Sequence, residues 1–200
     1  MAPEDPRAPA AAGTGAAPRP LRADARRNRD AVLRAAREAF EQEGVFTSLD
    51  GIAARAGVGN ATLYRHFPTR EDLLAAVIES SIATALEQAD DLVRALPPRE
   101  ALAEWLVLLT WRLRTWHDLP SCLAGADESA SPVRSACDPL RARTAALLEV
   151  ARAAGDVAGG VTVDEVYELV VALSWAVDRF GTGEAAARRR VAVATAGLFA

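Results

Sequence analysis

One short stretch of the sequence gathers side chains that can bind nucleic acid. It runs from Val58 to Phe67 and reads VGNATLYRHF. On a helix, which turns about 100° per residue, Leu63 and Phe67 point to the same side. The opposite side carries Ala61, Thr62, Arg65 and His66. Because methyl, hydroxyl, guanidinium and imidazole groups contact base edges and phosphates, this side is predicted to face the major groove of DNA.

Two short helices and a tight turn are expected to position that side. Thr47 with Asp50 resembles a capping box with Asp in the usual place of Glu, so the first helix should run from there to Ala56. Gly57 then tolerates the positive φ that a tight turn needs. The second helix is expected over residues 60–67 and ends before Pro68.

The two helices can pack together only if a small residue lies where they cross and apolar residues fill the angle between them, and the sequence has both. The small side chain of Ala53 stands where the second helix would cross the first. The residues expected to fill the angle between the helices are Ile52, Val58 and Leu63. A further helix is predicted ahead of them, from about Asp24 to Gly44. The joint spacing predicts a helix-turn-helix unit.

The rest of the chain is expected to be helical as well. Its 45 alanines favour helices, and no stretch alternates apolar and polar residues as a half-buried strand would. Thr69 and Thr162 begin capping boxes, and Pro139 and Thr182 are read as two further helix starts. We therefore predict an all-α fold of about nine helices. The expected helices after residue 68 are 69–96, 99–117, 139–154, 162–180 and 184–199, with short helical pieces over 118–138.

Composition divides the chain into parts. The first twenty residues contain seven Ala, five Pro and two Gly without periodicity, so residues 1–21 are predicted to be a disordered tail. The helix-turn-helix unit is assigned to residues 22–70 and a connecting helix to 71–96. Pro97 and Pro98 separate that helix from a second helical domain over residues 97–200.

Charge is distributed unevenly along the chain. The net charge is −4, but residues 1–70 hold 11 Arg against 8 acidic residues, whereas residues 71–200 hold 12 Arg against 19. Between Arg19 and Arg37, seven Arg stand against two acidic residues. This uneven distribution of charge suggests that the N-terminal part of the chain binds a polyanion. The alternative is that these arginines form the solvated face of a helix.

The stretch from Val58 to Phe67, followed by PTREDLL, resembles the tetracycline-repressor-like (TetR) transcriptional regulators. The similarity covers roughly residues 28–80 and includes Gly44, residues 47–57 and Arg70. It implies an N-terminal DNA-binding domain followed by a ligand-binding and dimerisation domain over residues 97–200.

The resemblance also implies roles for individual residues. Members of the family contact the DNA backbone through positions that match Thr47, Tyr64, His66 and Arg70. Base reading would fall to Asn60, Ala61, Thr62 and Arg65, since Asn suits adenine and Arg suits guanine.

The sequence departs from the family pattern at two positions, where Asp50 replaces a frequent Arg and Asn60 replaces a commonly basic residue. Asp50 is therefore expected to cap a helix rather than to contact phosphate. The departures leave more of the binding to an arginine-rich arm over residues 19–29, which includes Arg26 and could follow phosphates or enter a minor groove.

Large side chains are concentrated beyond residue 97. Because the resemblance implies a ligand cavity among these helices, they are candidates for lining it. The candidate ligand-binding residues are Trp105, Leu109, Trp116, His117, Cys122 and Trp175. The alternative for each tryptophan is a place in the hydrophobic core.

Several functional classes are disfavoured. His117 and Cys122 lack a third group that would orient a nucleophile and its base, so we do not expect an enzyme. Two cysteines and two histidines provide neither a disulfide framework nor a zinc site, and no metal or cofactor is expected. No apolar run approaches the length of a membrane span, and the N-terminus lacks a signal-peptide pattern. A cytoplasmic protein is predicted.

The function expected from the sequence is regulation of transcription. The chain should bind a palindromic DNA operator as a repressor and be released by a small apolar ligand; a nucleoid-type DNA-binding protein without an effector pocket is the alternative. Homodimerisation is expected through the last two helices. The apolar residues expected at this interface are Val163, Val166, Tyr167, Val170, Val171, Trp175, Val177, Val191, Ala194 and Leu198. The effector, the operator and the sign of the ligand's effect are left open.

Overall fold

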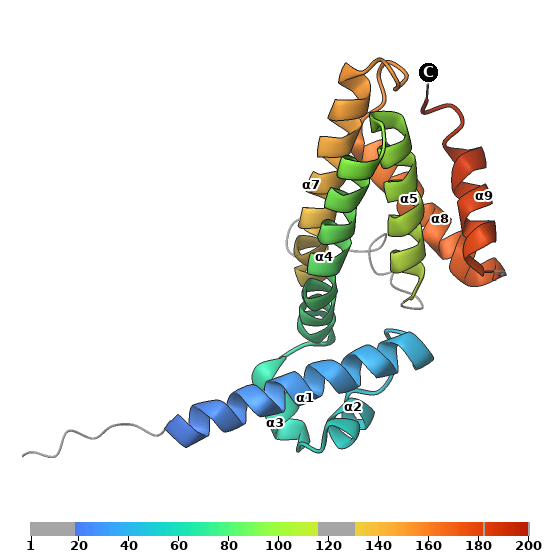
Figure 1. Ribbon diagram of the computed structural model, residues 1–200. Helices are drawn as coiled ribbons and strands as arrows, with labels where there is room; N and C mark the ends of the chain where they lie inside the picture. Colours follow the sequence, from blue (N-terminus) through green and yellow to red (C-terminus); the bar gives the residue numbers. More distant parts are fainter. Residues whose placement is uncertain (1–18, 116–130, 182, 200) are drawn as a thin grey trace, which may run out of the picture.

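The computed structural model describes residues 19–115, 131–181 and 183–199. Within these ranges the chain forms eight helices and no extended strand, so the predicted all-α class is confirmed. The helices make a small lower body of α1–α3 and a larger upper body, with α4 joining the two (Figure 1). Of the tail expected over residues 1–21, only 1–18 lie outside the described residues, and 19–21 are helical. The part 118–130 of the short pieces expected over 118–138, and the cap at Thr182, also lie outside them.

The lower body consists of α1 (Arg19–Glu43), α2 (Leu49–Ala56) and α3 (Asn60–His66). α1 begins five residues before the expected start at Asp24 and ends just before Gly44, which has a φ of 87°. Val32 and Phe40 of α1 are fully buried, and α1 packs against α2, α3 and the lower part of α4. The helix-turn-helix pair is thus held on one long supporting helix.

α4 (Arg70–Ala95) extends from the lower body through the upper one. The predicted capping box is confirmed, because the Thr69 hydroxyl accepts from the backbone N–H of Asp72 and the Asp72 carboxylate accepts from the N–H of Thr69. Further along α4, Ser80 accepts a 2.5 Å hydrogen bond from Arg37 of α1. This hydrogen bond joins α4 to α1, against which α4 also packs.

The upper body adds α5 (Pro98–Thr115), α7 (Pro132–Ala153), α8 (Val163–Phe180) and α9 (Gly183–Ala194). α5 is central, packing against α4, α7, α8 and α9. Its fully buried Trp105 donates a 2.9 Å hydrogen bond from Nε1 to the Thr144 hydroxyl of α7, which in turn donates to the Leu140 carbonyl. A buried indole N–H thus finds a partner inside the core.

The start expected for α7 at Pro139 is wrong. Ser131 is the N-cap and Pro132 stands in the first turn, leaving Pro139 exposed inside the helix. Pro139 removes one backbone hydrogen bond. The helix nevertheless continues across it because Val133, Ala136 and Cys137 before it are buried on the same core.

The C-terminal end of α9 also differs from expectation, since the helix ends at Ala194 rather than near Phe199. The residues beyond it pair instead with the loop between α7 and α8: Ala158 donates a 2.8 Å hydrogen bond to the Leu198 carbonyl, and Val157 forms a bridge with Phe199. Arg99 at the start of α5 lies 4.8 Å from the ring centre of Phe199. The C-terminal residues thus close the upper end of the body. No helix in the described ranges is both long and apolar enough to cross a membrane.

Candidate nucleic-acid interface

The turn between α2 and α3 has the geometry that the sequence predicts. Gly57 adopts a left-handed conformation with φ 68° and ψ 28°. Its N–H donates to the Ala54 carbonyl, and the N–H of Val58 donates to the Ala53 carbonyl at 3.0 Å. These are the two hydrogen bonds of a Schellman motif, and they fix the direction in which α3 leaves α2.

The cap at the start of α2 is one residue later than expected. Ser48, not Thr47, is the N-cap, and its hydroxyl accepts from the backbone N–H of Gly51 at 3.3 Å. Asp50 lies exposed in the first turn, where a negative charge suits the helix dipole. The Thr47 hydroxyl is engaged elsewhere, so the predicted Thr47–Asp50 capping box is wrong.

α3 is anchored by its inner side. Leu63 is fully buried and Phe67 nearly so, which confirms that these residues point inward together. Ile52 and Ala53 of α2 are also buried against them, as expected for a helix crossing over a small side chain. Val58 is partly buried beside this cluster. The other side of α3 is therefore the one left for a ligand.

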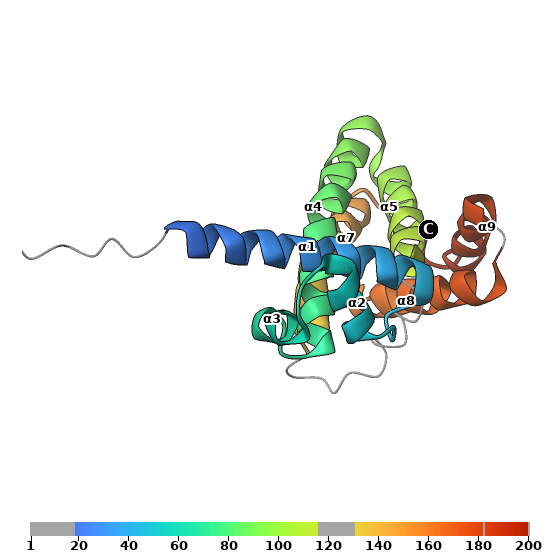
Figure 2. The ribbon, with the colours of Figure 1, turned by 90° about the horizontal axis from the view of Figure 1, so that it is seen from below.

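That other side carries the predicted DNA-contacting residues. Asn60, Ala61, Tyr64 and Arg65 are exposed, whereas Thr62 and His66 are partly buried. Arg65 forms no ion pair with any of the described residues. Viewed from below, α1, α2 and α3 lie in front of the upper body, so nothing drawn from α5, α7, α8 or α9 covers α3 (Figure 2). The structure brings these six residues to one accessible end of the molecule.

Arg70 has a structural contact that the sequence did not reveal. One nitrogen of its guanidinium, Nη1, donates to the Val45 carbonyl at 2.9 Å and to the Thr47 carbonyl at 2.5 Å. These bonds tie the first turn of α4 to the loop between α1 and α2. The guanidinium has further N–H groups, because an arginine has five donors. Arg70 can therefore hold the loop and still offer hydrogen bonds outward.

Glu43 is a residue at this end that sequence reasoning missed. Its carboxylate accepts from the Thr47 hydroxyl at 2.6 Å and pairs with Arg55 of α2. These two hydrogen bonds hold the pKa of Glu43 below its usual value. We call Glu43, Thr47 and Arg55 the loop clamp. The four-residue spacing of Glu43 and Thr47 could have indicated the first contact, but the contact with Arg55 depends on the tertiary fold.

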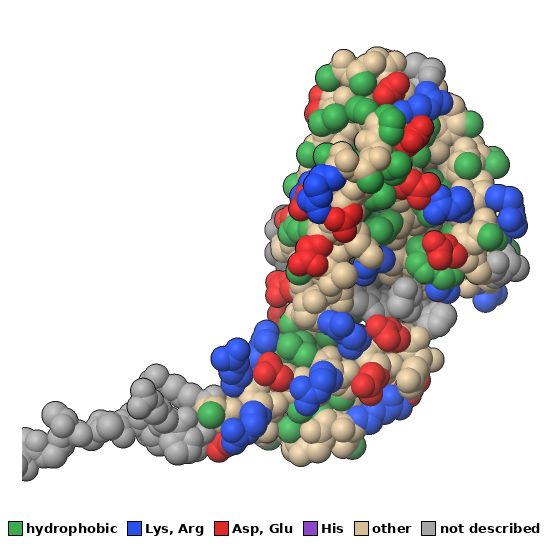
Figure 3. Space-filling model, viewed as in Figure 1, with side chains coloured by type: hydrophobic (Ala, Val, Ile, Leu, Met, Phe, Trp, Pro, Cys, Tyr) green, Lys and Arg blue, Asp and Glu red, His purple; other side chains and the backbone are tan. Residues whose placement is uncertain are grey.

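Arginines of α1 border the same end. Arg26 is exposed and Arg27 pairs with Asp24, while the Arg29 guanidinium lies 5.4 Å from the ring centre of Phe67. Blue arginine side chains lie along this helix in the space-filling view with red acidic groups between them, and both kinds also occur over the upper body (Figure 3). The arginine-rich stretch noted in the sequence therefore lies at the surface of the lower body. Arg29 is exposed, and its guanidinium lies within cation–π distance of the ring at the end of α3.

The predicted ligand-binding residues do not gather at one place. Trp105 and Leu109 are fully buried in the core, and Trp175 is 48% exposed and packs edge-on against Phe180. Trp116, His117 and Cys122 lie outside the described residues. A pocket between α4, α5 and α9 is lined by none of the six.

Comparisons with known proteins agree with this geometry. Residues 32–77 match the model of bacterial regulatory proteins of the tetR family, and residues 97–200 match the C-terminal domain of SbtR-like transcriptional regulators. A TetR transcription regulatory protein from Mycobacterium vanbaalenii is 34% identical, with a TM-score of 0.51, covering 90% of this chain and all of that one.

Two further relatives match over a shorter stretch or at lower sequence identity. An HTH-type transcriptional regulator of Staphylococcus aureus is 39% identical over 69 residues, which are 34% of this chain and 37% of the staphylococcal protein. The chain thus matches little more than a third of that relative's length. The regulator FadR of Bacillus subtilis, solved with stearoyl-CoA, has a TM-score of 0.63 at 16% identity over 84% of this chain and 98% of that one, which shows a shared fold.

The fold and the exposed side of α3 define a helix-turn-helix DNA-binding protein of the non-enzymatic, regulatory class. With matches to both its N-terminal and C-terminal domains, the chain belongs to the TetR family of bacterial transcriptional regulators.

Proposed function

We propose that this protein is a cytoplasmic, homodimeric repressor that binds a palindromic DNA operator and is released from it by a small molecule. The observation that carries the proposal is the exposed outer side of α3, whose inner side is anchored by buried Leu63 and Phe67. A short helix held in this way can enter a major groove without losing its packing.

Within this proposal the residues divide into two groups. Asn60, Ala61, Thr62 and Arg65 read bases, because they lie on the first turns of α3 or project from its outer side. The residues proposed to contact the backbone are Thr47, Tyr64, His66, Arg70 and Arg26 of α1. The hydroxyl of Thr47 donates its hydrogen to Glu43 in the free protein, so a phosphate must compete with Glu43 for that hydrogen.

Dimerisation is proposed through α8 and α9. One seven-residue recognition helix contacts too few bases to specify a site, so two must act together. Val166, Val170 and Val177 of α8 are buried in their own protomer, which leaves fewer residues for a partner than the sequence suggested. The apolar residues left exposed are Trp175, Phe180 and Val193, at 48%, 65% and 79%.

Release by a ligand is proposed to act through α4, which is continuous for 26 residues and belongs to both bodies. A ligand that fits one position of α4 better than another shifts the population toward that position. The two recognition helices of the dimer must match about one turn of DNA, roughly 34–36 Å, so a small change of tilt weakens binding. FadR of Bacillus subtilis, which shares this fold, holds stearoyl-CoA, and this supports a ligand-binding role for the upper body.

A gel-shift titration tests the proposal. The full chain is titrated against the promoter that flanks its own gene and against random duplex of the same length and salt. Specific binding typically exceeds non-specific binding by about 10³-fold or more, and this is the expected result. Equal affinity for both duplexes would instead indicate the nucleoid-type alternative.

A further inference from the structure

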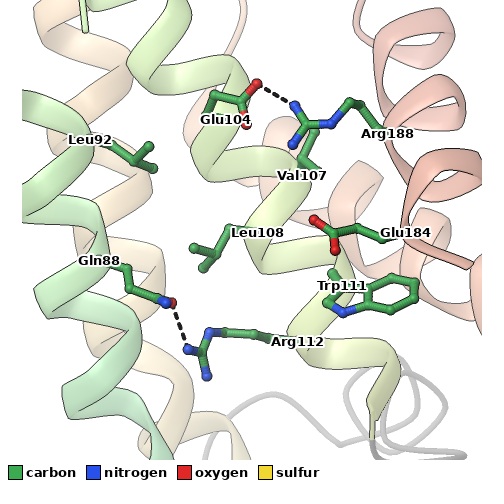
Figure 4. Close-up of a pocket in the computed structure, with 9 residues that line it drawn as sticks. All are labelled: Gln88, Leu92, Glu104, Val107, Leu108, Trp111, Arg112, Glu184 and Arg188. Atoms are coloured by element: carbon green, nitrogen blue, oxygen red, sulfur yellow. Dashed lines mark hydrogen bonds and ion pairs between the residues drawn. The ribbon is translucent and has the colours of Figure 1, made fainter. Parts of the chain in front are cut away.

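A pocket of about 370 Å³ opens between three helices of the upper body, away from the DNA-contacting end. Helices α4, α5 and α9 contribute its walls (Figure 4). The residues that line it are Gln88, Leu92, Glu104, Val107, Leu108, Trp111, Arg112, Glu184 and Arg188. We call it the α4–α9 groove. Its volume lies at the lower end of the range of small-molecule sites.

The middle of the groove is apolar. Leu108 lies at its centre in Figure 4, with Leu92 on the α4 side and Trp111 toward α9. Leu92 and Leu108 are only partly buried, so their side chains still have apolar surface to cover. A hydrocarbon chain laid across them would remove that surface from water, at roughly 25 cal/mol for each Å² buried.

The two arginines on either side of this apolar middle differ in how many carboxylates lie near them. On the α9 side, Arg188 pairs with Glu104 and is also attracted by Glu184, so two carboxylates share one guanidinium. On the α4 side, the only hydrogen-bond partner of Arg112 among the described residues is the neutral side-chain oxygen of Gln88, at 2.6 Å. Burial lowers the pKa of Arg112, and no carboxylate counteracts this. Arg112 is thus a partly buried cation without an anionic partner among the described residues.

A carboxylate is the anion that such a guanidinium recognises best, because two parallel N–H···O bonds match its planar fork. The two acidic residues of the groove lie on the opposite side of Leu108 from Gln88 and Arg112 (Figure 4). We propose that the α4–α9 groove binds an amphipathic monocarboxylate, with its carboxylate on Arg112 and its hydrocarbon chain across Leu108 and Leu92.

The proposed ligand would act on the helix that reaches the DNA-binding body. Gln88 belongs to α4 and Arg112 to α5, so their hydrogen bond is a polar link between these helices. A carboxylate that takes over the donors of Arg112 weakens this link and leaves α4 freer to tilt against α5. This step rests on the proposed function, whereas occupation of the groove does not.

The binding test uses octanoate, below the concentration at which it forms micelles, and isothermal titration of the full chain. Octanoate should bind the native protein, and Arg112→Gln should weaken the affinity at least tenfold while octanol binds both proteins alike. Arg94→Gln is the matched control, because Arg94 also lies on this body but is exposed and paired with Asp91. It should leave octanoate binding unchanged.

A second variant keeps the test informative if Arg112→Gln folds poorly. Gln88→Glu provides Arg112 with a carboxylate inside the protein, which should hold the fold and weaken octanoate binding by a comparable factor. Absence of octanoate binding to the native protein would overturn the proposal. Binding that survives both Arg112→Gln and Gln88→Glu, or that Arg94→Gln weakens equally, would also overturn it.

The effect on DNA is measured separately, by gel shift with and without octanoate. A protein that binds octanoate at Arg112 but prefers no DNA sequence would contradict the proposed function and leave the groove assignment standing. A protein that prefers its operator but does not bind octanoate would contradict the groove assignment alone.

Discussion

At the scale of single residues, two glycines of the lower body have opposite conformational requirements. Gly51 lies inside α2, and a Cβ there would meet only the Ser48 Cβ at 3.7 Å, an ordinary contact. Gly57 has a φ of 68°, where a Cβ is strained although no atom lies within 4 Å of it. The sequence identified Gly57 as the turn residue.

Opposite stability changes are expected at these two positions. Gly51→Ala should raise the free energy of unfolding by about 0.5–1 kcal/mol, and Gly57→Ala should lower it by about 1 kcal/mol or more. Each kcal/mol corresponds to roughly 2–4 °C in melting temperature for a chain of this size. Thermal melts followed by circular dichroism measure both changes. If Gly57→Ala melted at or above the native temperature, the turn would not need its left-handed residue.

Arg70 combines a structural contact with a proposed phosphate contact, and salt dependence separates them. Arg70→Ala should weaken binding to operator and random DNA alike and lower the slope of log affinity against log salt by about 0.9 per arginine lost. A thermal melt of the free variant reports the loss of the bonds to Val45 and Thr47. An unchanged salt slope with weaker binding would show that Arg70 only holds the loop.

At the scale of the helices, the loop clamp joins the end of α1 to α2. Hydrogen bonds lower the pKa of Glu43 in the folded protein, so the unfolded state binds its proton more readily. The clamp therefore stabilises the fold fully above the unfolded pKa of a glutamate, about 4.3, and less as the pH falls through the lowered folded value.

Glu43→Gln tests this dependence. The melting temperature of the native protein should exceed that of Glu43→Gln at neutral pH, and the difference should shrink as the pH falls below about 4.3. Glu41→Gln is the matched control, since Glu41 is exposed on the same helix and forms no hydrogen bond with the described residues. A difference that grows on acidification would contradict the clamp.

Local signals account for the elements that could be predicted. Gly57, the capping boxes at Thr69 and Thr162, and the inward pair Leu63 and Phe67 each depend on residues a few positions apart. Because these interactions are local, the helix-turn-helix unit and the exposed side of α3 followed from sequence spacing.

The features that escaped prediction depend on tertiary contacts. α7 continues through Pro139 because its buried residues pack on the upper core, and α9 ends early because Leu198 pairs with Ala158. Trp105, expected near a ligand, is buried in the core and bonded to Thr144. Replacing it with alanine would cost about 3–5 kcal/mol of stability, so ligand loss in that variant would say little about a binding site.

At the scale of the whole molecule, exposed apolar side chains of α8 and α9 form the surface proposed to contact a second copy of the chain. Trp175, Phe180 and Val193 are more exposed than large apolar residues usually are, and Trp175 and Phe180 pack together. We expect a dimer at micromolar concentration and a monomer for Trp175→Glu, because a buried unpaired charge opposes association. Sedimentation velocity distinguishes them. Val93→Glu, at an exposed valine of α4, should remain dimeric; a monomeric native protein would contradict this interface.

The central claim is that the exposed side of α3 reads DNA bases, and Arg65 tests it most directly. The affinities of the native protein and of Arg65→Ala are measured for the operator, for operators with single base-pair changes and for random duplex. Arg65→Ala should lose discrimination at one base pair of each half-site, at a cost of roughly 1–3 kcal/mol, and bind random DNA nearly as before. Equal weakening on operator and random DNA would contradict the claim and make Arg65 a backbone contact.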